Sequence, residues 1–410
     1  MSISALLSGA SGASGASGAS GASGASGASG ASGASGASGA SGASGASGAS
    51  GASGAAGSYG SFVSGALITA RDGFVGAWNG ATRTPEAVPG GSGQALQRAA
   101  PWVRAYIMHQ EVLGQLAFQT IAAEAPSQNA VLVAHKPTSG LNPTVGGAQD
   151  YEVQAETIAS FVAPTKDYFA AQLEFVNDYI AQRPDRGQEI LSQVGFPTPF
   201  FASVISLHPA QKPKTLELIS LAQAIASTVV MQVKHGLACR RPDEYSTQIQ
   251  PMIPTPGHGT LPSGHATEAF IVAQLMSHFL ASAGHDARES TERMLMGAAH
   301  RIAVNRTVAG VHFPVDSIAG AGLGVMLGDL MTALATADVA LPISKISFDV
   351  TSQANHDFYV GDAFNFNVDA RTSILKSALG LNVTAGELAS PPTAATGLNW
   401  LWTEALREWA

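Results

Sequence analysis

The stretch TLPSGHATEAF, residues 260–270, decides how this chain folds around a site. Pro262, Ser263, Gly264 and His265 stand directly before an apolar pattern with helical spacing. Gly264 can bring its backbone N–H close to a ligand, and Ser263 adds a hydroxyl. The amides at the start of the following helix would favour an anion at the same point. Alone, however, a Ser-Gly-His is more often a simple helix cap, so the segment needs partners elsewhere.

A second segment, KHGLACRRP at 234–242, places Lys234 at a predicted helix end and Arg241 in the turn that follows. One cation at a helix C-terminus is common, because it offsets the partial negative charge there. Lys234 alone therefore indicates only a surface lysine. The segment gains meaning from the other charges of the chain.

The third segment is NRTVAGVHFPVDSIAG, residues 305–320, which holds Arg306, His312 and Asp316. His312 and Asp316 are four residues apart and share a face if this stretch is helical. Asp316 could then accept a hydrogen bond from one imidazole nitrogen and fix the tautomer. The other nitrogen would be free as a nucleophile or as a ligand to a metal atom.

Together the three segments supply three fixed cations, a helix terminus, a hydroxyl and two histidines, in a chain of net charge −8. Gathering positive charge in one place is costly unless an anion neutralises it. A tetrahedral oxyanion matches these donors, since Arg binds oxygens in pairs and Lys acts as a point charge. His312 would bond to the central atom, and His265 would serve as acid or base.

The three segments, in this order and at these spacings, resemble the signature of the type 2 phosphatidic acid phosphatase (PAP2) and vanadium-dependent haloperoxidase superfamily. The matching residues are Lys234, Arg241, Pro242, Pro262, Ser263, Gly264, His265, Arg306, His312 and Asp316. The combination is specific, whereas any one segment would be a weak indication. The first 60 and last 70 residues lie outside the resemblance.

The resemblance implies a role for each residue. The ligands of the vanadate or phosphate oxygens would be Lys234, Arg241, Arg306, Ser263 and Gly264. His312 would bond vanadium, or attack phosphorus in a phosphatase, and Asp316 would orient it. His265 would be the acid–base residue. Members of the superfamily often have Ser before the third-segment Arg, where this chain has Asn305.

Three features favour the peroxidase over the phosphatase: no expected membrane span, a long chain without a clear secretory signal, and His258 seven residues before His265. A histidine there resembles the bromide- and iodide-oxidising members. We therefore expect halide oxidation by hydrogen peroxide at a vanadate bound to His312, with a small organic acceptor. Lys234 would polarise the peroxide oxygen, and His258 would help to move protons. The alternatives are a soluble acid phosphatase with a phosphohistidine intermediate, and a non-catalytic anion-binding or assembly protein.

The fold expected from periodicity is mainly helical, a bundle of the vanadium haloperoxidase/PAP2 type. The expected helices are 101–125, two within 150–184 broken near Pro164, 213–236, 265–284, 286–307 and 314–337. Strand signals before residue 340 are weak. Alternating stretches at 346–352 and 358–370 predict two strands, and the last twenty residues predict a terminal helix.

The chain divides by composition into three parts. Residues 1–60 are a Gly-Ala-Ser repeat without Pro in the other positions, which indicates a disordered tether more than a collagen helix. Residues 61–342 are the expected catalytic domain, and 343–410 a small appended region containing some β-structure. The repeat could mediate weak self-association, so a homo-oligomer is one expectation.

The bulk composition restricts partners and compartment. The negative net charge disfavours nucleic acid and anionic membrane surfaces. Cys239 is the only cysteine, which excludes an intrachain disulfide. The most apolar stretch, 317–343, carries Asp329 and Asp338 and is rich in Gly and Ala, so we expect a buried helix and no membrane span. A soluble, cytoplasmic protein is therefore expected.

Overall fold

The computed structural model divides the chain into two units, residues 1–102 and 103–410, which are described separately. The described residues are 70, 74–75, 77–80, 82–122, 129–136, 155–285, 288–338, 340–366, 374–389 and 395–410. The predicted disorder of residues 1–60 falls outside them. In the first unit, α5 (Gly93–Arg98) begins at Ser92, whose hydroxyl accepts the Ala95 N–H at 3.3 Å.

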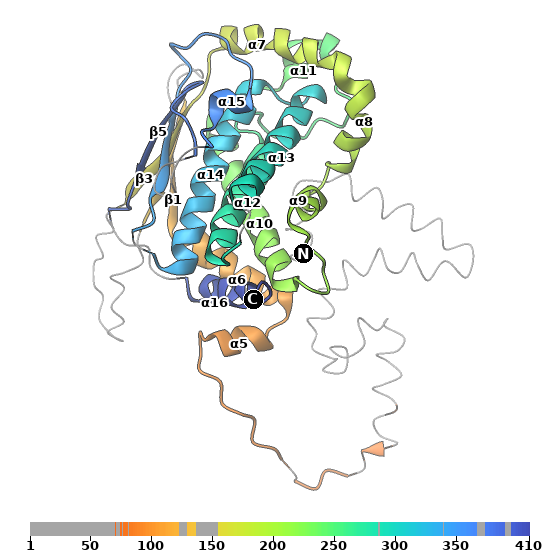
Figure 1. The fold of residues 1–410 in the computed structure, drawn as a ribbon, viewed down its shortest axis with the longest axis vertical. Coiled ribbons are helices and arrows are strands. Elements are labelled where there is room, and N and C mark those ends of the chain that lie inside the picture. Colours follow the sequence, from red (N-terminus) through yellow and green to blue (C-terminus); the bar gives the residue numbers. More distant parts are fainter. Residues whose placement is uncertain are drawn as a thin grey trace, which may run out of the picture. The chain divides into compact units, whose positions relative to one another are not determined.

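Four long helices form the centre of the second unit (Figure 1). They are α10 (Pro213–Leu237), α12 (Gly264–Ser282), α13 (Arg288–Val308) and α14 (Pro314–Thr336). Pro at the first position starts α10 and α14, where a missing N–H costs nothing. The bounds agree with the four long helices predicted from sequence spacing, and the mainly helical class is confirmed.

Helices α12 and α14 pack closely because three glycines of α14 lie one turn apart. A Cβ at Gly320 would lie 2.7 Å from the Ser263 carbonyl oxygen, and one at Gly324 would lie 2.7 Å from the Thr267 carbonyl oxygen. A Cβ at Gly328 would meet Gln274 Cβ at 2.7 Å. Since real side chains do not approach so closely, glycine sets the distance between these two helices.

Shorter helices surround the bundle: α6 (Pro101–Leu113), α7 (Lys166–Tyr179), α8 (Arg183–Ser192), α9 (Thr198–Ile205), α11 (Pro242–Tyr245), α15 (Val360–Ala363), α16 (Thr396–Leu406) and the 3₁₀ turns η4 (Ile180–Gln182) and η5 (Thr247–Ile249). In Figure 1, α7 and α8 cross one end of the bundle and α16 crosses the other. The predicted terminal helix is confirmed as α16.

The end of α16 also completes the start of α10. No side chain of the capping residue itself bonds the first turn of α10. Instead the Glu408 carboxylate accepts the N–H groups of Lys214 and Thr215, at 2.6 and 2.9 Å. Trp409 adds an indole hydrogen bond to the Thr215 hydroxyl at 2.9 Å. A carboxylate at a helix N-terminus is stabilising, so this contact fixes the helix that carries Lys234.

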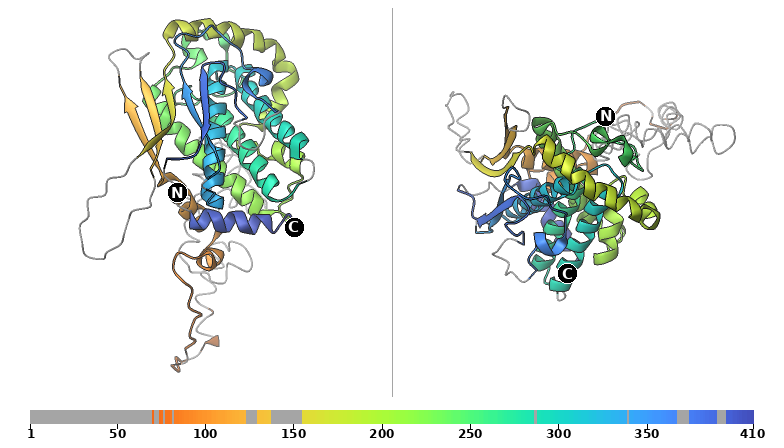
Figure 2. Two further views of the ribbon diagram at one scale, coloured as in Figure 1. Left: turned by 60° about the vertical axis from the view of Figure 1, so that its left-hand side comes forward. Right: turned by 90° about the horizontal axis from the view of Figure 1, so that it is seen from above.

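One sheet of five strands packs beside the helices (Figure 2). Its strands, in spatial order, are β1 (Leu116–Ile121), β2 (Ala130–His135), β3 (Glu156–Val162), β4 (Ile343–Phe348) and β5 (Leu381–Gly386). Neighbouring strands are antiparallel except β3 and β4, which pair in parallel with Ala159 opposite Ile346. The sheet therefore joins chain segments from before and after the four long helices.

Three sequence predictions are wrong in this region. The helix expected over 101–125 ends at Leu113 and gives way to β1, and the first helix expected in 150–184 is β3. Strand pairing across the sheet overrides the local helical spacing there. The strand expected at 358–370 is instead partly α15, because Phe358 and Phe364 turn in to pack on Phe270 of α12.

The expectation that no segment could span a membrane is also wrong. Residues Pro213–Tyr245 and Pro314–Thr336 have the length and mean hydropathy, 1.5 and 1.6, of a span. The Gly, Ala and Asp329 of the second segment had suggested a buried helix that does not span a membrane. Its other apolar side chains nevertheless give it the mean hydropathy of a span. In the fold, 67% of the first apolar window and all of the second are buried. The expectation of a soluble, cytoplasmic protein rested on the missing span and is corrected with it.

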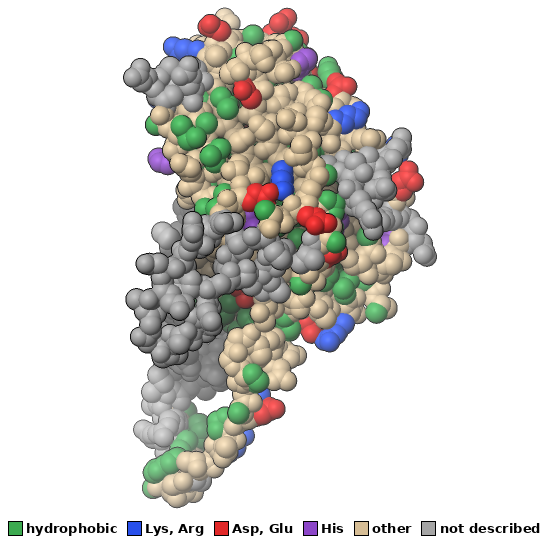
Figure 3. All heavy atoms as spheres, turned by 90° about the vertical axis from the view of Figure 1, so that its left-hand side faces the viewer, with side chains coloured by type: hydrophobic (Ala, Val, Ile, Leu, Met, Phe, Trp, Pro, Cys, Tyr) green, Lys and Arg blue, Asp and Glu red, His purple; other side chains and the backbone are tan. Residues whose placement is uncertain are grey.

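The surface on the side of the sheet is mixed in character. Figure 3 shows hydrophobic side chains there scattered among Lys, Arg, Asp and Glu side chains. Apolar side chains of the strands instead turn inward: Val131, Val133, Ile158 and Phe161 are fully or almost fully buried. The sheet thus contributes one face to the same hydrophobic core as the helices.

Candidate functional site

The three signature segments meet where the four long helices begin or end. Lys234 lies in the last turn of α10, and Arg241 precedes α11. Ser263 caps α12, and its backbone N–H donates to the Asp316 carbonyl at 2.8 Å. Arg306 lies in the last turn of α13. The sequence-distant charges are thereby brought to one place.

His312 is held by the Asp316 carboxylate. Its Nδ1 lies 2.9 Å from Asp316 Oδ2, which also accepts the Phe313 N–H at 2.9 Å and the Thr260 hydroxyl. Because a carboxylate only accepts, Nδ1 carries the proton and Nε2 presents a lone pair. Burial, with the charges of Arg241 and Lys234, holds the pKa of His312 well below its usual value. The imidazole is therefore neutral, and its unprotonated Nε2 has a lone pair.

Arg241 and Lys234 are both buried and bind backbone carbonyls of the loops before α12 and α14. Lys234 Nζ donates to the carbonyls of Gly259 and Thr260 at 2.8 and 2.7 Å. Arg241 donates from Nε to the His258 carbonyl at 2.9 Å and from Nη1 to the Val311 carbonyl at 2.7 Å. Arg241 Nη1 also lies 3.5 Å from His312 Nε2. Two fixed cations thus lie beside the imidazole.

Arg306 is the least satisfied group of the site. Its Nη2 donates to Gln193 Oε1 at 3.1 Å and to the Ile190 carbonyl at 3.3 Å. Its Nε and Nη1 are buried and have no hydrogen-bond partner among the described residues. Burial lowers its pKa to about 10. A buried guanidinium edge with two unused donors suits the paired oxygens of an oxyanion.

His265 and His258 approach the site from the start of α12 and from the preceding loop. His265 Nε2 donates to the Gln193 carbonyl at 2.7 Å, so Nδ1 is the ring nitrogen that can gain or lose a proton. Burial first, then the Arg306 charge, lowers the pKa of His265 to about 3. His258 Nδ1 lies 3.2 Å from Arg241 Nη2, and burial and the Lys234 charge lower its pKa to about 4. Both histidines are neutral at pH 7 while no anion is bound.

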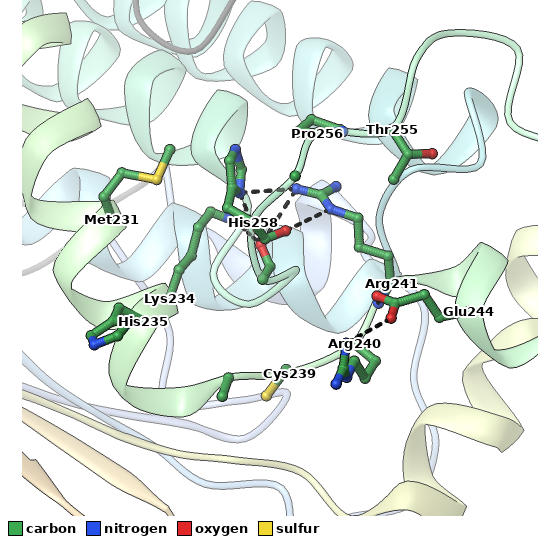
Figure 4. A pocket seen from close by; sticks show the side chains of 13 residues that line it. Met231, Lys234, His235, Cys239, Arg240, Arg241, Glu244, Thr255, Pro256 and His258 are labelled. Atoms are coloured by element: carbon green, nitrogen blue, oxygen red, sulfur yellow. Dashed lines mark hydrogen bonds and ion pairs between the residues drawn. The ribbon is translucent and has the colours of Figure 1, made fainter.

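A cavity of about 760 Å³ opens beside these groups. Figure 4 shows Lys234, Arg241 and His258 turned toward one another at its wall. The rest of the lining is Met231, His235, Ala238, Cys239, Arg240, Glu244, Thr255, Pro256, Gly257 and Gly259. His312, His265 and Arg306 are not part of this lining. Of the three signature cations, Lys234 and Arg241 line the cavity and Arg306 does not.

Ser263 and Gly264 lie at the first turn of α12, as the sequence predicted. The Ser263 hydroxyl accepts the Ala266 N–H at 3.4 Å, so it serves as the helix cap. The expected hydroxyl ligand is thus occupied in part by capping. Gly264 is the first residue of the helix, where N–H groups lack partners within the helix.

Three residues that the sequence argument overlooked also reach the site. Thr260 bonds both Asp316 and His312, and it stood within the decisive stretch without being singled out. Gln193, at the end of α8, contacts Arg306 and His265, and nothing in its local sequence marks it. Glu268 lies one turn beyond Gly264, and burial raises its pKa to about 7.

Asn305, where the superfamily often has Ser, is fully buried and bonded at both ends of its amide. It donates to Glu189 Oε1 at 2.8 Å and to Gln193 Oε1 at 2.9 Å, and accepts from Arg186 at 3.0 Å. This departure does not disrupt the site. It ties α13 to α8 directly behind Arg306.

The donors suit a tetrahedral oxyanion, phosphate and vanadate alike, since the two unused N–H groups of Arg306 and the free His312 nitrogen match both. Within the described parts of the chain, no group of three His, Cys, Asp or Glu side chains is placed to hold a bare metal ion. The arrangement is that of a helical protein with buried cations, two unused N–H donors and a neutral histidine at the ends of its long helices.

Comparison with known proteins names the family. Residues 216–339 match the model of the PAP2 superfamily, which supports the resemblance seen in the three signature segments. Residues 7–63 match a model described as collagen triple helix repeat (20 copies), with which the repeat shares its glycine period. No curated protein sequence matches the chain.

One solved structure that resembles part of the chain is described as the first transmembrane PAP2 type phosphatidylglycerolphosphate phosphatase from Bacillus subtilis. It is 19% identical, with a TM-score of 0.33, over 40% of this chain and 84% of that chain. At that identity and TM-score the likeness assigns no activity.

Proposed function

We propose that the chain is a PAP2-type phosphatase that hydrolyses a phosphate ester through a phosphohistidine on His312. The observation that carries the proposal is the buried Arg306 guanidinium with two unused N–H donors, together with a neutral His312 imidazole oriented by Asp316. A phosphoryl group would satisfy these donors and neutralise the cations around it. The match of residues 216–339 to the PAP2 superfamily model supports the same choice.

In the first half of the reaction, His312 Nε2 would attack phosphorus, and the ester P–O bond would break. The leaving oxygen would take a proton from His265 Nδ1, which needs the protonated form of that residue. Bound phosphate would cancel the Arg306 charge that helps to depress the His265 pKa, and so favour that form. Asp316 would stabilise the imidazolium that develops on His312.

In the second half, water would attack the phosphohistidine, and neutral His265 would take the proton that the water gives up. The P–N bond would then break and return the electron pair to His312, releasing inorganic phosphate. Lys234, Arg241 and Arg306 would hold the phosphoryl oxygens through both halves. All groups return to their starting protonation, so the cycle balances.

The expected haloperoxidase activity has no support in the family match. Vanadate as a resident cofactor stays a prediction. Lys234, Arg241, Arg306 and His312 would hold it as they would hold phosphate, and it would supply a Lewis acid for peroxide chemistry. The choice between the two activities is a matter for direct assay.

The test is hydrolysis of p-nitrophenyl phosphate by the purified full chain in detergent, with orthovanadate as inhibitor. Wild type should turn over and vanadate should compete, while His312→Ala should bind phosphate without turnover. Acid-labile, base-stable phosphorylation should be trapped in rapid quench experiments with wild type alone. Peroxide-dependent bromination with vanadate, without hydrolysis of the ester, would overturn the proposal. Phosphate binding without either reaction would leave only an anion-binding protein.

A further inference from the structure

Gln193 is a fully buried side chain outside the segment that matches the superfamily, and it contacts two groups of the site at once. It follows the last residue of α8, and its own N–H is bonded to the carbonyl of Glu189 at 3.1 Å. The backbone here is therefore fixed. A side chain of another helix that bonds to Gln193 is therefore held in a defined position.

The side chain and the main chain of Gln193 reach different groups. Its Oε1 accepts from Arg306 Nη2 at 3.1 Å and from Asn305 Nδ2 at 2.9 Å, both on α13. Its carbonyl accepts from His265 Nε2 at 2.7 Å, on α12. One residue thus connects the oxyanion-binding guanidinium with the acid–base imidazole, on two separate helices.

Each contact determines which atoms the site can use. With Nη2 tied to Gln193, the Nε and Nη1 edge of Arg306 is the one left without a partner. With Nε2–H donated to the Gln193 carbonyl, Nδ1 of His265 is the nitrogen left to exchange a proton. The orientation of both groups therefore depends on the end of α8.

The end of α8 is itself fixed to α13 by charge. Glu189, one turn before Gln193, accepts two hydrogen bonds from Arg301, at 2.8 Å from Nε and 2.7 Å from Nη2. The same carboxylate accepts from Asn305 Nδ2 at 2.8 Å and from Gln193 Nε2 at 3.3 Å. The contacts from Arg301 and Asn305 thus hold the end of α8 against α13.

We infer that Gln193 is a positioning residue of the oxyanion site, which aims Arg306 through its side chain and His265 through its carbonyl. The inference rests on the proposed phosphatase for its kinetic effects but not for its effect on anion binding. The side chain and the carbonyl act on different steps, so they can be separated by mutation.

Gln193→Met keeps the length of the side chain and removes the acceptor for Arg306, while the carbonyl stays in place. Orthovanadate and phosphate affinity, measured by isothermal titration calorimetry on the full chain in detergent, should fall roughly 10- to 100-fold, the effect of losing a hydrogen bond to a charged group. The KM should rise in parallel. The pH at which kcat is half-maximal, set by His265, should not move.

Gln193→Gly removes the side chain and also frees the backbone that holds the carbonyl. The loss of affinity should match that of Gln193→Met, and in addition the half-maximal pH of kcat should shift. Gln223→Met is the matched control: Gln223 is a buried amide of α10 that bonds Thr198 and no residue of the site. It should lower stability while anion affinity and pH profile stay unchanged.

The outcomes separate this inference from the proposed function. Wild-type protein that binds vanadate but hydrolyses no ester would refute the proposed phosphatase activity. Calorimetry of vanadate binding would still test the positioning role of Gln193. Gln193→Met that binds vanadate as tightly as wild type would refute the positioning role. An equal loss of affinity in Gln223→Met would show a general effect of buried amides. Wild type that binds neither anion would overturn both.

Discussion

Replacing Gly320 of α14 by Ala tests whether the close approach of α12 and α14 builds the site. The new Cβ would lie 2.7 Å from the Ser263 carbonyl oxygen and 2.8 Å from Ala266 Cβ. Carbon atoms rest about 3.5–4.0 Å apart, so the helices must separate by several tenths of an ångström or more. Overpacking costs about 1–3 kcal/mol, and the better helix propensity of Ala returns about 1 kcal/mol. We expect a net loss of up to about 2 kcal/mol.

Two matched variants make the experiment decisive. Gly324→Ala meets the Thr267 carbonyl oxygen at 2.7 Å, one turn farther from Ser263, and should lose similar stability. Gly297→Ala, on the exposed side of α13 with no atom within 4 Å, should gain about 1 kcal/mol. Unfolding of all three would be followed by circular dichroism in detergent, and hydrolysis of p-nitrophenyl phosphate at a temperature where each is folded.

The kinetic expectation differs between the two destabilised variants. Only Gly320→Ala displaces Ser263, whose N–H bonds the carbonyl of Asp316 beside the nucleophile. Small displacements of this kind can cost up to 100-fold in rate, so kcat should fall at least about 10-fold for Gly320→Ala and little for Gly324→Ala. A Gly320→Ala protein as stable as Gly297→Ala would refute the packing argument. Equal kcat values for the two destabilised variants would refute the link to the site.

Further predictions concern the titratable groups. Burial raises the pKa of Glu268 from 4.5 to about 7, so the free energy of unfolding of wild type should fall as pH rises through this window. Relative to wild type, Glu268→Gln should gain about 3 kcal/mol in stability between pH 4.5 and pH 8, measured by denaturant titration. A stability difference that does not change with pH would contradict this. Because His265 must be protonated for the first step, kcat should rise as pH falls below 7, and His265→Ala should abolish this limb of the profile. Asp316→Asn should keep the fold but lower kcat about 10³- to 10⁴-fold through the wrong His312 tautomer, as steady-state kinetics would show; a tenfold loss or less would exclude an orienting role.

What the sequence could predict depended on local chemistry. The bounds of α10, α12 and α14 follow from Pro at their starts and from Ser263 as a cap, signals carried by neighbouring residues. The spacing of His312 and Asp316 also predicted their contact, which the structure gives at 2.9 Å, although His312 precedes α14 and does not share a helical face with Asp316. Motifs whose partners lie within one turn can be interpreted without a fold.

What the sequence could not predict depends on distant contacts. The strand β1 has an apolar spacing that also fits a helix, and pairing with β2 decides it. Gln193 lies 112 and 113 positions before its partners on α13 and carries no charge that would attract notice. The membrane expectation failed for a related reason, since a helix buried in a bundle and one that crosses a bilayer need the same apolar length.

The parallel pairing of β3 with β4 has a consequence for biosynthesis. Ser160 and Ser347, which bond across these strands, are 187 positions apart, so β3 emerges from the ribosome long before its neighbour. At roughly 5–20 residues added per second, the edge of β3 that pairs with β4 lacks its partner strand for about 10–40 s. During that interval the nascent chain offers a ready template to other polypeptides. Chaperone supply and translation speed should therefore govern the yield of this protein more than its final stability does.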